Sequence, residues 1–367
     1  MYNDIYKGKK VLITGNTGFK GSWLTTWLLE LGANVIGLSD RIPTNPSMFE
    51  ALELAKKIDH HTIDIRNYPQ VKELIEKTKP DFIFHLAAQA IVSDSYKDPL
   101  TTIQTNVMGT ASVLEALRSY DHPCTVVMIT SDKCYENVEW TWGYRENDRL
   151  GGKDPYSASK AGAEIIFHTY YHSFFSNKDS VVRITSARAG NVIGGGDWAQ
   201  SRIVPDCIRA WSLDKPVIIR RPVSTRPWQH VLEPISGYLT LGKTLYQHPE
   251  LTGESYNFGP ASDQTFKVKE LIDEVALNWT FKKDQQQMIV LENPGFHEAG
   301  LLKLNCDKAL HDLKWKPVLG FSDAARLTAS WYNLYYHNKE KDLYSFTLSQ
   351  IAEYATVAKK INTEWTN

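Results

Sequence analysis

The sequence predicts an α/β protein with a doubly wound parallel sheet and a smaller C-terminal lobe. Three observations predict this fold. Short apolar runs alternate with segments of helical periodicity through the first half of the chain, as expected for strands joined by crossover helices. The first apolar run leads directly into a glycine-rich turn. After residue 189, three consecutive glycines (194–196) and closely spaced prolines divide the chain into short elements.

The elements follow in order from these patterns. Leu24, Trp27, Leu28 and Leu31 share one face of the first helix, which Gly32 ends. We expect buried strands at 11–14, 34–38, 61–65, 82–86, 125–130 and 180–186, and further helices at 71–78, 105–119 and 156–175. A helix at 232–246 should return to the main sheet. The predicted organisation is a first domain over 1–189, a lobe mainly over 190–330, and terminal helices at 331–336 and 348–358 within 331–367.

Composition excludes several classes of protein. The chain has 367 residues, with 41 Lys and Arg against 42 Asp and Glu, so no global field attracts nucleic acid or an anionic membrane. The four cysteines are scattered without metal-ligand spacing, which favours a reducing compartment and no bound metal. No apolar run approaches the ~18 residues of a membrane span, and no signal sequence is evident. We expect a cytoplasmic protein.

The turn after the first strand has the spacing of a dinucleotide-binding loop. It contains Gly15, Gly18 and Gly21 between an apolar strand and an amphipathic helix. Glycines let the backbone approach a pyrophosphate, and the helix amino terminus offers N–H donors and a favourable dipole. The spacing alone also fits an ordinary glycine turn, but its strand–helix context favours a Rossmann-type cofactor site.

The choice of dinucleotide rests on the next strand ends. Asp40 lies about where an acid binds the ribose hydroxyls of NAD, whereas Arg41 would suit the 2′-phosphate of NADP. We favour NAD, and NADP remains an alternative. Asp64 and Ile65 are placed to meet the adenine. The alternatives are that Asp40 is a solvated loop acid and Asp64 a turn acid.

Ser131, Tyr156 and Lys160 are suited to moving a proton on and off a hydroxyl during hydride transfer. Ser131 ends a strand, and Tyr156 and Lys160 lie one turn apart at the start of a long helix. A phenol is a poor base at neutral pH, but an ammonium and an oxidised nicotinamide favour its phenolate. The neighbouring Asp132 and Lys133 add an acid and a candidate base that a plain dehydrogenase does not require. The alternative is a helix-surface Tyr–Lys pair.

Several longer strings resemble the extended short-chain dehydrogenase/reductase family. They are the glycine loop, His85-Leu-Ala-Ala-Gln89, Thr105-Asn-Val-Met-Gly-Thr110, Asp154-Pro-Tyr-Ser-Ala-Ser-Lys160 and Arg188-Ala-Gly-Asn-Val192. Four more specific strings, at 129–136, 142–147, 190–198 and 226–233, resemble the CDP-glucose branch of the nucleotide-sugar 4,6-dehydratases. The likeness covers about residues 8–320.

The resemblance implies a reaction in three steps on CDP-glucose. Tyr156 takes the C4 hydroxyl proton as hydride passes to NAD⁺, water leaves across C5–C6, and hydride returns to C6. Asp132 matches the acid that protonates the departing C6 hydroxyl. Lys133 stands where related dTDP-sugar enzymes carry a glutamate that removes the C5 proton, and the CDP-sugar branch resembles this chain in having lysine. The alternative is that Lys133 only pairs with Asp132 or a loop carboxylate.

Further binding residues are also implied by the resemblance. Cofactor contacts are expected from Thr17, Phe19, Lys20, Leu86, Ala87, Ala88 and Asn106, beside the loop glycines and the Tyr156–Lys160 pair. Substrate contacts are expected from Gln89, Asn191, Arg202, Arg226, Asn257 and His297. Trp198 and Trp228 could border the nucleotide, although tryptophans more often belong to the core.

The same resemblance implies a homodimer through a four-helix interface. The helices near 102–119 and 156–175 carry the apolar residues Val107, Val113, Leu114, Leu117, Ile165, Ile166 and Phe167. Two other functions stay open: a nucleotide-sugar epimerase or simple dehydrogenase on the same scaffold, and a non-catalytic dinucleotide-sensing protein. The intact Ser131, Tyr156 and Lys160 argue against the last.

Overall fold

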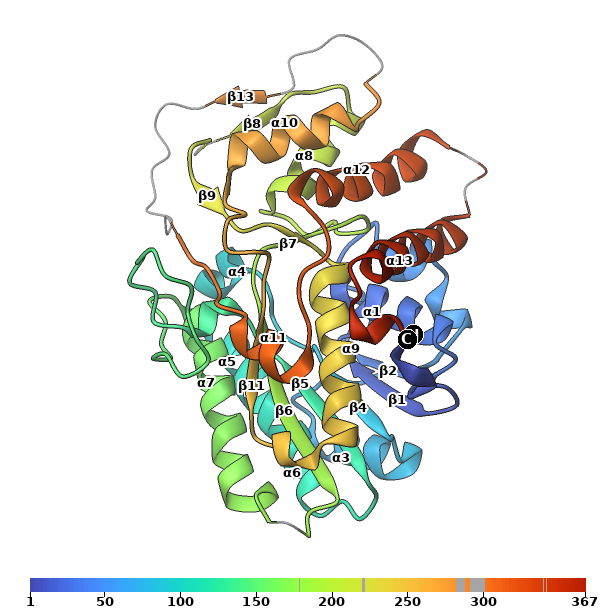
Figure 1. Cartoon of the computed structure of the whole chain (residues 1–367), viewed down its shortest axis with the longest axis vertical. Coiled ribbons are helices and arrows are strands. Elements are labelled where there is room, and N and C mark those ends of the chain that lie inside the picture. Colours follow the sequence, from blue (N-terminus) through green and yellow to red (C-terminus); the bar gives the residue numbers. More distant parts are fainter. Residues whose placement is uncertain (178, 220–221, 282–287, 291–300, 339, 341) are drawn as a thin grey trace.

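The fold is built on a seven-stranded parallel sheet (Figure 1), as predicted. The computed structural model describes residues 1–367 apart from 178, 220–221, 282–287, 291–300, 339 and 341. The strands lie in the order β11 (Ser255–Phe258), β6 (Val182–Ala189), β5 (Cys124–Ile129), β4 (Phe82–His85), β1 (Lys10–Thr14), β2 (Asn34–Ser39) and β3 (Asp59–Thr62). The order reverses between β1 and β4, where open α/β sheets bind ligands beyond the carboxyl ends of the strands.

Helices cover both faces of this sheet. The helices of the described residues, in chain order, are α1 (Phe19–Glu30), α2 (Met48–Ala51), α3 (Tyr68–Thr78), α4 (Val92–Lys97), α5 (Pro99–Ile103), α6 (Gly109–Arg118), α7 (Pro155–Tyr170), α8 (Ile203–Ser212), α9 (Leu232–Gln247), α10 (Val268–Leu277), α11 (Asp307–Leu313), α12 (Phe321–His337) and α13 (Leu343–Lys360). Single turns are η1 (Tyr2–Asp4), η2 (Leu54–Lys56), η3 (Gln104–Met108), η4 (Asp132–Cys134), η5 (Tyr171–Phe175), η6 (Pro249–Leu251) and η7 (Glu364–Thr366).

Alternate residues of each strand enter different hydrophobic cores. Val127 and Ile129 of β5 join a core with α1, α9 and α13, whereas Val126 and Met128 join a second core with α3, α6 and α7. Successive side chains of a strand point to opposite faces. A strand covered on both faces therefore reads as a continuous apolar run, which is why β5 was predictable.

The structure confirms most predicted elements and shifts several boundaries. The third strand spans Asp59–Thr62 rather than 61–65, because this edge strand is polar and its apolar neighbours lie beyond it. Helical structure before α6 begins at Pro99 and passes through the π-helical turn η3. The helix predicted at 232–246 is α9, which packs on β5 and β6 of the main sheet. β6 extends to Ala189.

The lobe lies above the main sheet in Figure 1 and consists of short elements. α8 and α10 pack together there. Three small two-stranded sheets pair β7 (Val192–Ile193) with β10 (Gln229–His230), β9 (Thr225–Arg226) with β12 (Phe266–Lys267), and β8 (Val217–Ile219) with β13 (Met288–Val290).

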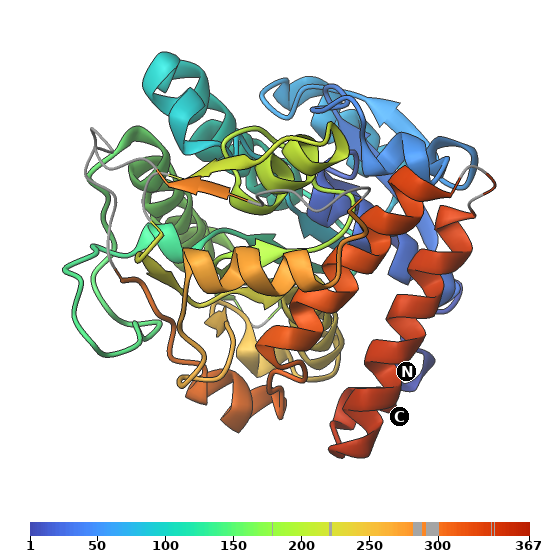
Figure 2. The ribbon, with the colours of Figure 1, turned by 90° about the horizontal axis from the view of Figure 1, so that it is seen from above.

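Both terminal helices are longer than predicted, and they join the two parts of the chain. α12 packs on α10 of the lobe, and α13 packs on both α12 and α1. Figure 2 shows the ends of the chain side by side beyond α13. There the Tyr2 and Trp365 rings stack with centroids 5.3 Å apart.

Of the apolar residues predicted for a subunit interface, Ile165 alone is exposed. Val113, Leu114, Leu117 and Phe167 are buried in the core between α6, α7 and the sheet, so they face inward. This correction reflects the two apolar stripes of these helices, which the sequence pattern alone does not separate. The exposed apolar side chains among the described residues of this region include Leu100, Ile103, Met108 and Ile165.

Two features of the predicted chemistry can be checked across the described residues. None of their helices is long and apolar enough to cross a membrane. No group of three or more His, Cys, Asp or Glu side chains among them could hold a metal ion.

Candidate active site

The glycine-rich loop joins β1 to α1 at the carboxyl edge of the sheet. Gly15 has a φ of +75°, and a Cβ there would lie 2.8 Å from the backbone nitrogen of Ala87. A Cβ on Gly21 would lie 2.1 Å from the carbonyl oxygen of Gly15. Both positions require glycine, because the loop approaches the neighbouring strand end and its own helix too closely for a side chain.

The same loop leaves space for an anion at the start of α1. Apart from its chain neighbours, a Cβ on Gly18 would meet only the carbonyl oxygen of Gly15 within 4 Å, at 3.3 Å. Gly18 is the N-cap of α1 and provides no side-chain cap for the first N–H groups of the helix. Thr17 anchors the loop through a 2.7 Å hydrogen bond from its hydroxyl to the carbonyl oxygen of Arg41. This cradle fits a dinucleotide pyrophosphate.

The residues predicted to bind the ribose and adenine differ in their surroundings. Asp40 is exposed at the end of β2, with its carboxylate 3.9 Å from the Arg41 guanidinium. Asp64 accepts hydrogen bonds of 2.6–3.0 Å from the Arg66 guanidinium, which hold the pKa of Asp64 below its usual range. The Ile65 side chain is buried in the core beneath α6. In this structure Asp64 is thus paired with a neighbouring side chain, and the Ile65 side chain faces the core.

A chain of buried hydrogen bonds holds the end of β4 against the glycine loop. Thr14 Oγ1 lies 2.8 Å from His85 Nδ1 and accepts a 3.1 Å bond from the N–H of Ala87. Burial lowers the pKa of His85 to about 3, so this imidazole is neutral. Leu86 and Ala88 are half-buried on either side of Ala87. The predicted cofactor residues of this strand end therefore lie beside the glycine loop.

Asn106 and Gln89, which are predicted to bind cofactor and substrate, make hydrogen bonds within the protein. Asn106 accepts from the Gln89 N–H at 2.8 Å and donates to its carbonyl at 3.0 Å and to Ser159 Oγ at 2.8 Å. The Gln89 amide closes on the backbone of Ile91, with both bonds 2.8 Å long. These side chains fasten the loop after β4 to α7.

Ser131, Asp132 and Lys133 follow β5 and form the start of η4. Ser131 Oγ donates to Asp132 Oδ1 at 2.9 Å and accepts from the N–H of Lys133 at 3.2 Å. Burial raises the pKa of Asp132, against the opposing charge of Lys133 and the bond from Ser131. Within the described part of the chain, Lys133 Nζ makes no hydrogen bond or ion pair. The predicted acid is thus buried, and the neighbouring ammonium is not locked to it.

Tyr156 and Lys160 lie on the first turns of α7. Asp154 caps this helix by accepting a 2.9 Å bond from the N–H of Ser157. Burial raises the pKa of Tyr156 to about 12, although contact with the Ser131 hydroxyl lowers it. Burial lowers the pKa of Lys160 to about 8. The structure therefore brings the predicted serine and phenol together, with the lysine one turn along the same helix.

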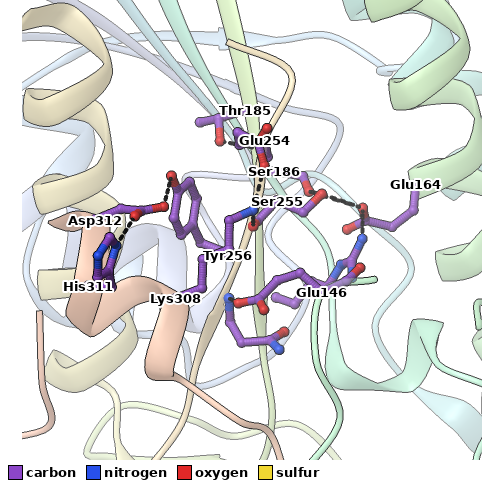
Figure 3. A network of polar contacts seen from close by, with 12 residues as sticks. Glu146, Glu164, Thr185, Ser186, Glu254, Ser255, Tyr256, Lys308, His311 and Asp312 are labelled. Atoms are coloured by element: carbon purple, nitrogen blue, oxygen red, sulfur yellow. Dashed lines mark hydrogen bonds and ion pairs between the residues drawn. The ribbon is translucent and has the colours of Figure 1, made fainter. Parts of the chain in front are cut away.

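A buried ion pair that the sequence analysis did not identify lies beneath this group. Glu164, one turn beyond Lys160, pairs with Arg188 of β6 at 2.7 Å, and both side chains are fully buried. Glu164 also accepts a hydrogen bond from Thr130. A further bond, from Ser186 at 3.0 Å, is drawn in Figure 3. The sequence does hold a signal for this pair, because Glu164 and Arg188 are charged residues within otherwise apolar segments. Such charges need partners inside a protein.

Charged side chains gather beside the phenol from α1 and the lobe. Arg202, the N-cap of α8, donates to Asp197 at 2.8 Å, and its positive charge acts on Tyr156. Lys20 is half-buried in the first turn of α1. Its pKa falls to about 8 through burial and the charge of Arg202, while Asp132 opposes the fall. Two cations thus share this region with the buried acid.

Asn191 and Arg226 lie in the segments that lead into the lobe. Asn191 stands between β6 and β7, two residues from the end of the main-sheet strand, and is half-buried. Its carbonyl oxygen accepts a 3.0 Å bond from the N–H of Gln229. Arg226 in β9 is half-buried and donates to the carbonyl oxygen of Thr225 at 2.8 Å.

Three residues predicted near the substrate are core residues in the structure. Asn257 is fully buried in β11, where it accepts from the Tyr135 hydroxyl at 2.8 Å and donates to the carbonyls of Tyr144 and Asn305. Its amide is used in packing the strand. Trp198 packs against the aromatic rings of α12, and Trp228 is buried in the same core. His297 lies outside the described residues.

Comparisons with known proteins agree with this geometry. The family model for GDP-mannose 4,6 dehydratase matches residues 12–328. A CDP-glucose 4,6-dehydratase of Salmonella typhimurium is 41% identical over 97% of this chain and 99% of that protein.

Two solved structures share the fold. A dTDP-glucose 4,6-dehydratase of Bacillus anthracis in complex with NAD has a TM-score of 0.73 at 20% identity, covering 93% of this chain and 100% of that one. A UDP-glucose 4-epimerase of Stenotrophomonas maltophila with bound NAD has a TM-score of 0.75 at 20% identity, covering 88% and 98%. With a match over most of its length, the chain belongs to the GDP-mannose 4,6 dehydratase family, within the extended short-chain dehydrogenases/reductases.

Proposed function

We propose that this protein is a hydro-lyase that converts CDP-glucose to CDP-4-keto-6-deoxyglucose with NAD as its resident cofactor. The single observation that carries the proposal is the buried Asp132 carboxyl, bonded to Ser131 and next to the Tyr156 phenol. Proton transfer at a carbinol requires the serine and the phenol. An additional buried acid is what water elimination requires. The 41% identical Salmonella relative supports the choice of sugar nucleotide.

NAD would be held by the glycine loop and the start of α1. The space at Gly18 and the uncapped helix start support a pyrophosphate there. Asp40 is exposed at the end of β2, where a carboxylate meets ribose hydroxyls. The related structures with bound NAD support this dinucleotide over NADP. When bound, it accepts the hydride from C4 of the hexose and later returns it to C6.

Tyr156, Ser131 and Lys160 would manage the proton of the C4 hydroxyl. Burial places the pKa of Tyr156 at about 12 in the protein alone, so its phenolate needs nearby positive charge. The ammonium of Lys160 predominates below its pKa of about 8, and the oxidised nicotinamide is also positive. Ser131 Oγ orients the hydroxyl toward the phenol.

Asp132 and Lys133 would carry out the elimination. After oxidation, the C4 carbonyl acidifies the C5 hydrogen, and a neutral Lys133 amine removes that proton. The C5–H electrons form the C5–C6 double bond as the C6–O bond breaks, and the Asp132 carboxyl gives its proton to the departing hydroxyl. Hydride then adds to C6 and a proton to C5. Burial raises the pKa of Asp132, which favours the protonated form that this role requires.

Arg202, Arg226 and Asn191 would hold the diphosphate and sugar at the lobe side of the site. A guanidinium fork matches phosphate oxygens. Arg202 is half-buried, and its positive charge lowers the pKa of Tyr156. This influence on the phenol supports a place for Arg202 near the reacting sugar. Lys20 adds a second cation in the first turn of α1.

Incubation of the purified protein with CDP-glucose, with and without added NAD, tests the proposal. We expect a 4-keto-6-deoxy sugar, detected by its alkaline absorbance and by the incorporation of one solvent hydrogen at C5. Recovery of unchanged sugar, or of sugar inverted at C4, would instead favour a dehydrogenase or an epimerase.

We also propose that the protein is a cytoplasmic homodimer. Leu100, Ile103, Met108 and Ile165 are exposed on α5, η3 and α7, and an apolar surface of this kind favours a subunit contact. The four cysteines are free thiols, which supports a reducing compartment. Sedimentation at micromolar concentration should give a dimer, and the Leu100→Glu and Ile165→Glu double variant should give a monomer. A monomeric wild-type protein would refute the dimer.

A further inference from the structure

Gly190 is the residue that faces the predicted acid from the neighbouring strand. It follows β6 directly, and β6 pairs with β5. A Cβ on Gly190 would lie 2.6 Å from Asp132 Oδ2, 3.1 Å from Asp132 Cγ and 3.6 Å from Asp132 Cβ. The carboxyl group therefore occupies the volume that any side chain at position 190 would need.

The Asp132 carboxyl is also held on its other side. Its Oδ1 accepts the 2.9 Å hydrogen bond from Ser131, and the residue is only 4% exposed. To reach an ordinary contact of 3.4 Å with a Cβ at position 190, Oδ2 would have to retreat by about 0.8 Å. Rotation about the Cβ–Cγ bond does not remove the short contact to Cγ. The carboxyl as a whole would have to move, while Ser131 Oγ would keep its separate 3.2 Å bond from the N–H of Lys133.

We propose that Gly190 is a positioning residue that sets the location of the Asp132 carboxyl and so commits the oxidised sugar to water loss. The inference rests on the proposed function. Gly190 lacks a positive φ, so its role is the space that it leaves rather than its backbone conformation. A methyl group at this position displaces the acid while leaving Tyr156 and Lys160 on their own helix.

The chemical consequence separates two steps of one reaction. C4 oxidation sends a hydride to the dinucleotide and a proton to Tyr156, and neither transfer uses Asp132. Breaking the C6–O bond requires a proton on the leaving oxygen, which the carboxyl supplies. A displaced acid therefore slows water loss and leaves the 4-keto sugar unreacted.

Gly190→Ala tests this separation in the full-length protein with NAD and CDP-glucose. Because a displacement of about 1 Å can reduce a rate on the order of 100-fold, we expect formation of the 4-keto-6-deoxy sugar to fall roughly 10- to 100-fold. C4 oxidation, followed in a single turnover by the absorbance of the reduced nicotinamide, should change by less than about threefold on this argument. Thermal unfolding and NAD binding measure whether the variant is folded.

A double-mutant cycle distinguishes an effect that acts through Asp132 from a general loss of structure. In an Asp132→Ala background the carboxyl is absent, so Gly190→Ala should have little further effect on water loss. The matched control is Gly259→Ala at the end of the adjacent β11. A Cβ there meets its nearest atom, Leu304 Cβ, at an ordinary 3.4 Å, and its activity should equal that of the wild type.

The outcomes are distinct. Wild-type product with an unaffected Gly190→Ala variant would overturn the inference alone. Equal losses from Gly190→Ala in both backgrounds would also overturn it, because the glycine would then act independently of Asp132. A wild-type protein that forms no 4-keto-6-deoxy sugar would refute the proposed function and this inference with it.

Discussion

Asp132 of η4 and Glu164 of the adjacent α7 are both buried carboxyls, yet their pKa values shift in opposite directions. Burial raises the pKa of Asp132, which accepts a hydrogen bond from Ser131. Burial also acts on Glu164, but the charge and hydrogen bond of Arg188, with bonds from Thr130 and Ser186, outweigh it and lower the pKa. The difference shows that a fully buried counter-charge, rather than burial itself, sets the direction in which the pKa of a buried carboxyl shifts.

Glu233 sharpens this comparison. It is buried in α9 and accepts bonds from the N–H groups of Val318 and Leu319 and from the Tyr354 hydroxyl, at 2.5–2.9 Å. Burial nevertheless raises its pKa to about 7. Three neutral hydrogen-bond donors therefore do not lower the pKa of Glu233, whereas the Arg188 guanidinium helps to lower that of Glu164. Of these three carboxyls, only the one paired with a guanidinium has a lowered pKa.

The largest expected effect comes from removing the proton of the predicted acid. Asp132→Asn should reduce formation of the 4-keto-6-deoxy sugar by about 10²–10⁴-fold, the usual contribution of a general acid. C4 oxidation and thermal stability should stay near wild-type values, because the amide can still accept the bond from Ser131. Product assays and single-turnover absorbance measure both. Dehydration at the wild-type rate would show that another group donates the proton.

Breaking the structural pair should instead affect stability. Arg188→Met leaves Glu164 buried without its counter-charge, and we expect the free energy of unfolding to fall by about 3–5 kcal/mol. Urea denaturation measures this change. The Glu164→Gln and Arg188→Met double variant should recover much of the loss, since no isolated charge remains. A single variant as stable as the wild type would contradict the pairing argument.

Lys133→Ala tests the base without touching either carboxyl. C4 oxidation should persist, whereas exchange of the C5 hydrogen with solvent deuterium should slow by about 100-fold, as measured by NMR of the sugar nucleotide. Lys153→Ala, at an exposed position before α7, is the control. Normal C5 exchange in the Lys133 variant would remove this residue from the mechanism.

The smallest effect is a pH dependence of stability at Glu233. Its folded-state pKa is raised, so the stability that it contributes is complete below its unfolded pKa and is lost as pH rises through about 7. Between pH 6 and 8 the wild-type free energy of unfolding should fall by roughly 1 kcal/mol more than that of Glu233→Gln. Parallel pH profiles for the two proteins would show that Glu233 does not titrate there.

The strands could be predicted from the sequence wherever a buried strand consists of consecutive apolar residues. β1, β2, β4 and β5 show such runs because helices cover both faces of the sheet. β3, which is an edge strand, carries Asp59 and two histidines, so its boundaries were predicted two to three residues too late. The first helix is buried on more than its predicted face, with Trp23 and Thr26 inaccessible beside Leu24 and Trp27.

The site could be predicted only where chemistry follows local position. Ser131 at a strand end and Tyr156 on the next helix meet because parallel strands and their crossover helices share one edge. The surroundings of Asn257 and Asn106 depend on partners far along the chain, such as Tyr135 and Ser159. No local pattern states whether such an amide faces a ligand or is bonded inside the protein.

The π-helical turn η3, between α5 and α6, places neighbouring side chains on two different surfaces. It directs Asn106 inward to the loop after β4, while Met108 two residues later is exposed. Deleting a single residue here would rotate everything before it by about 100° relative to α6. The Asn106 amide would then lose its hydrogen bonds to the backbone of Gln89, and Met108 would no longer lie on the same surface. The extra residue in this helical turn thus lets Asn106 face the loop after β4 while Met108 faces the outer surface.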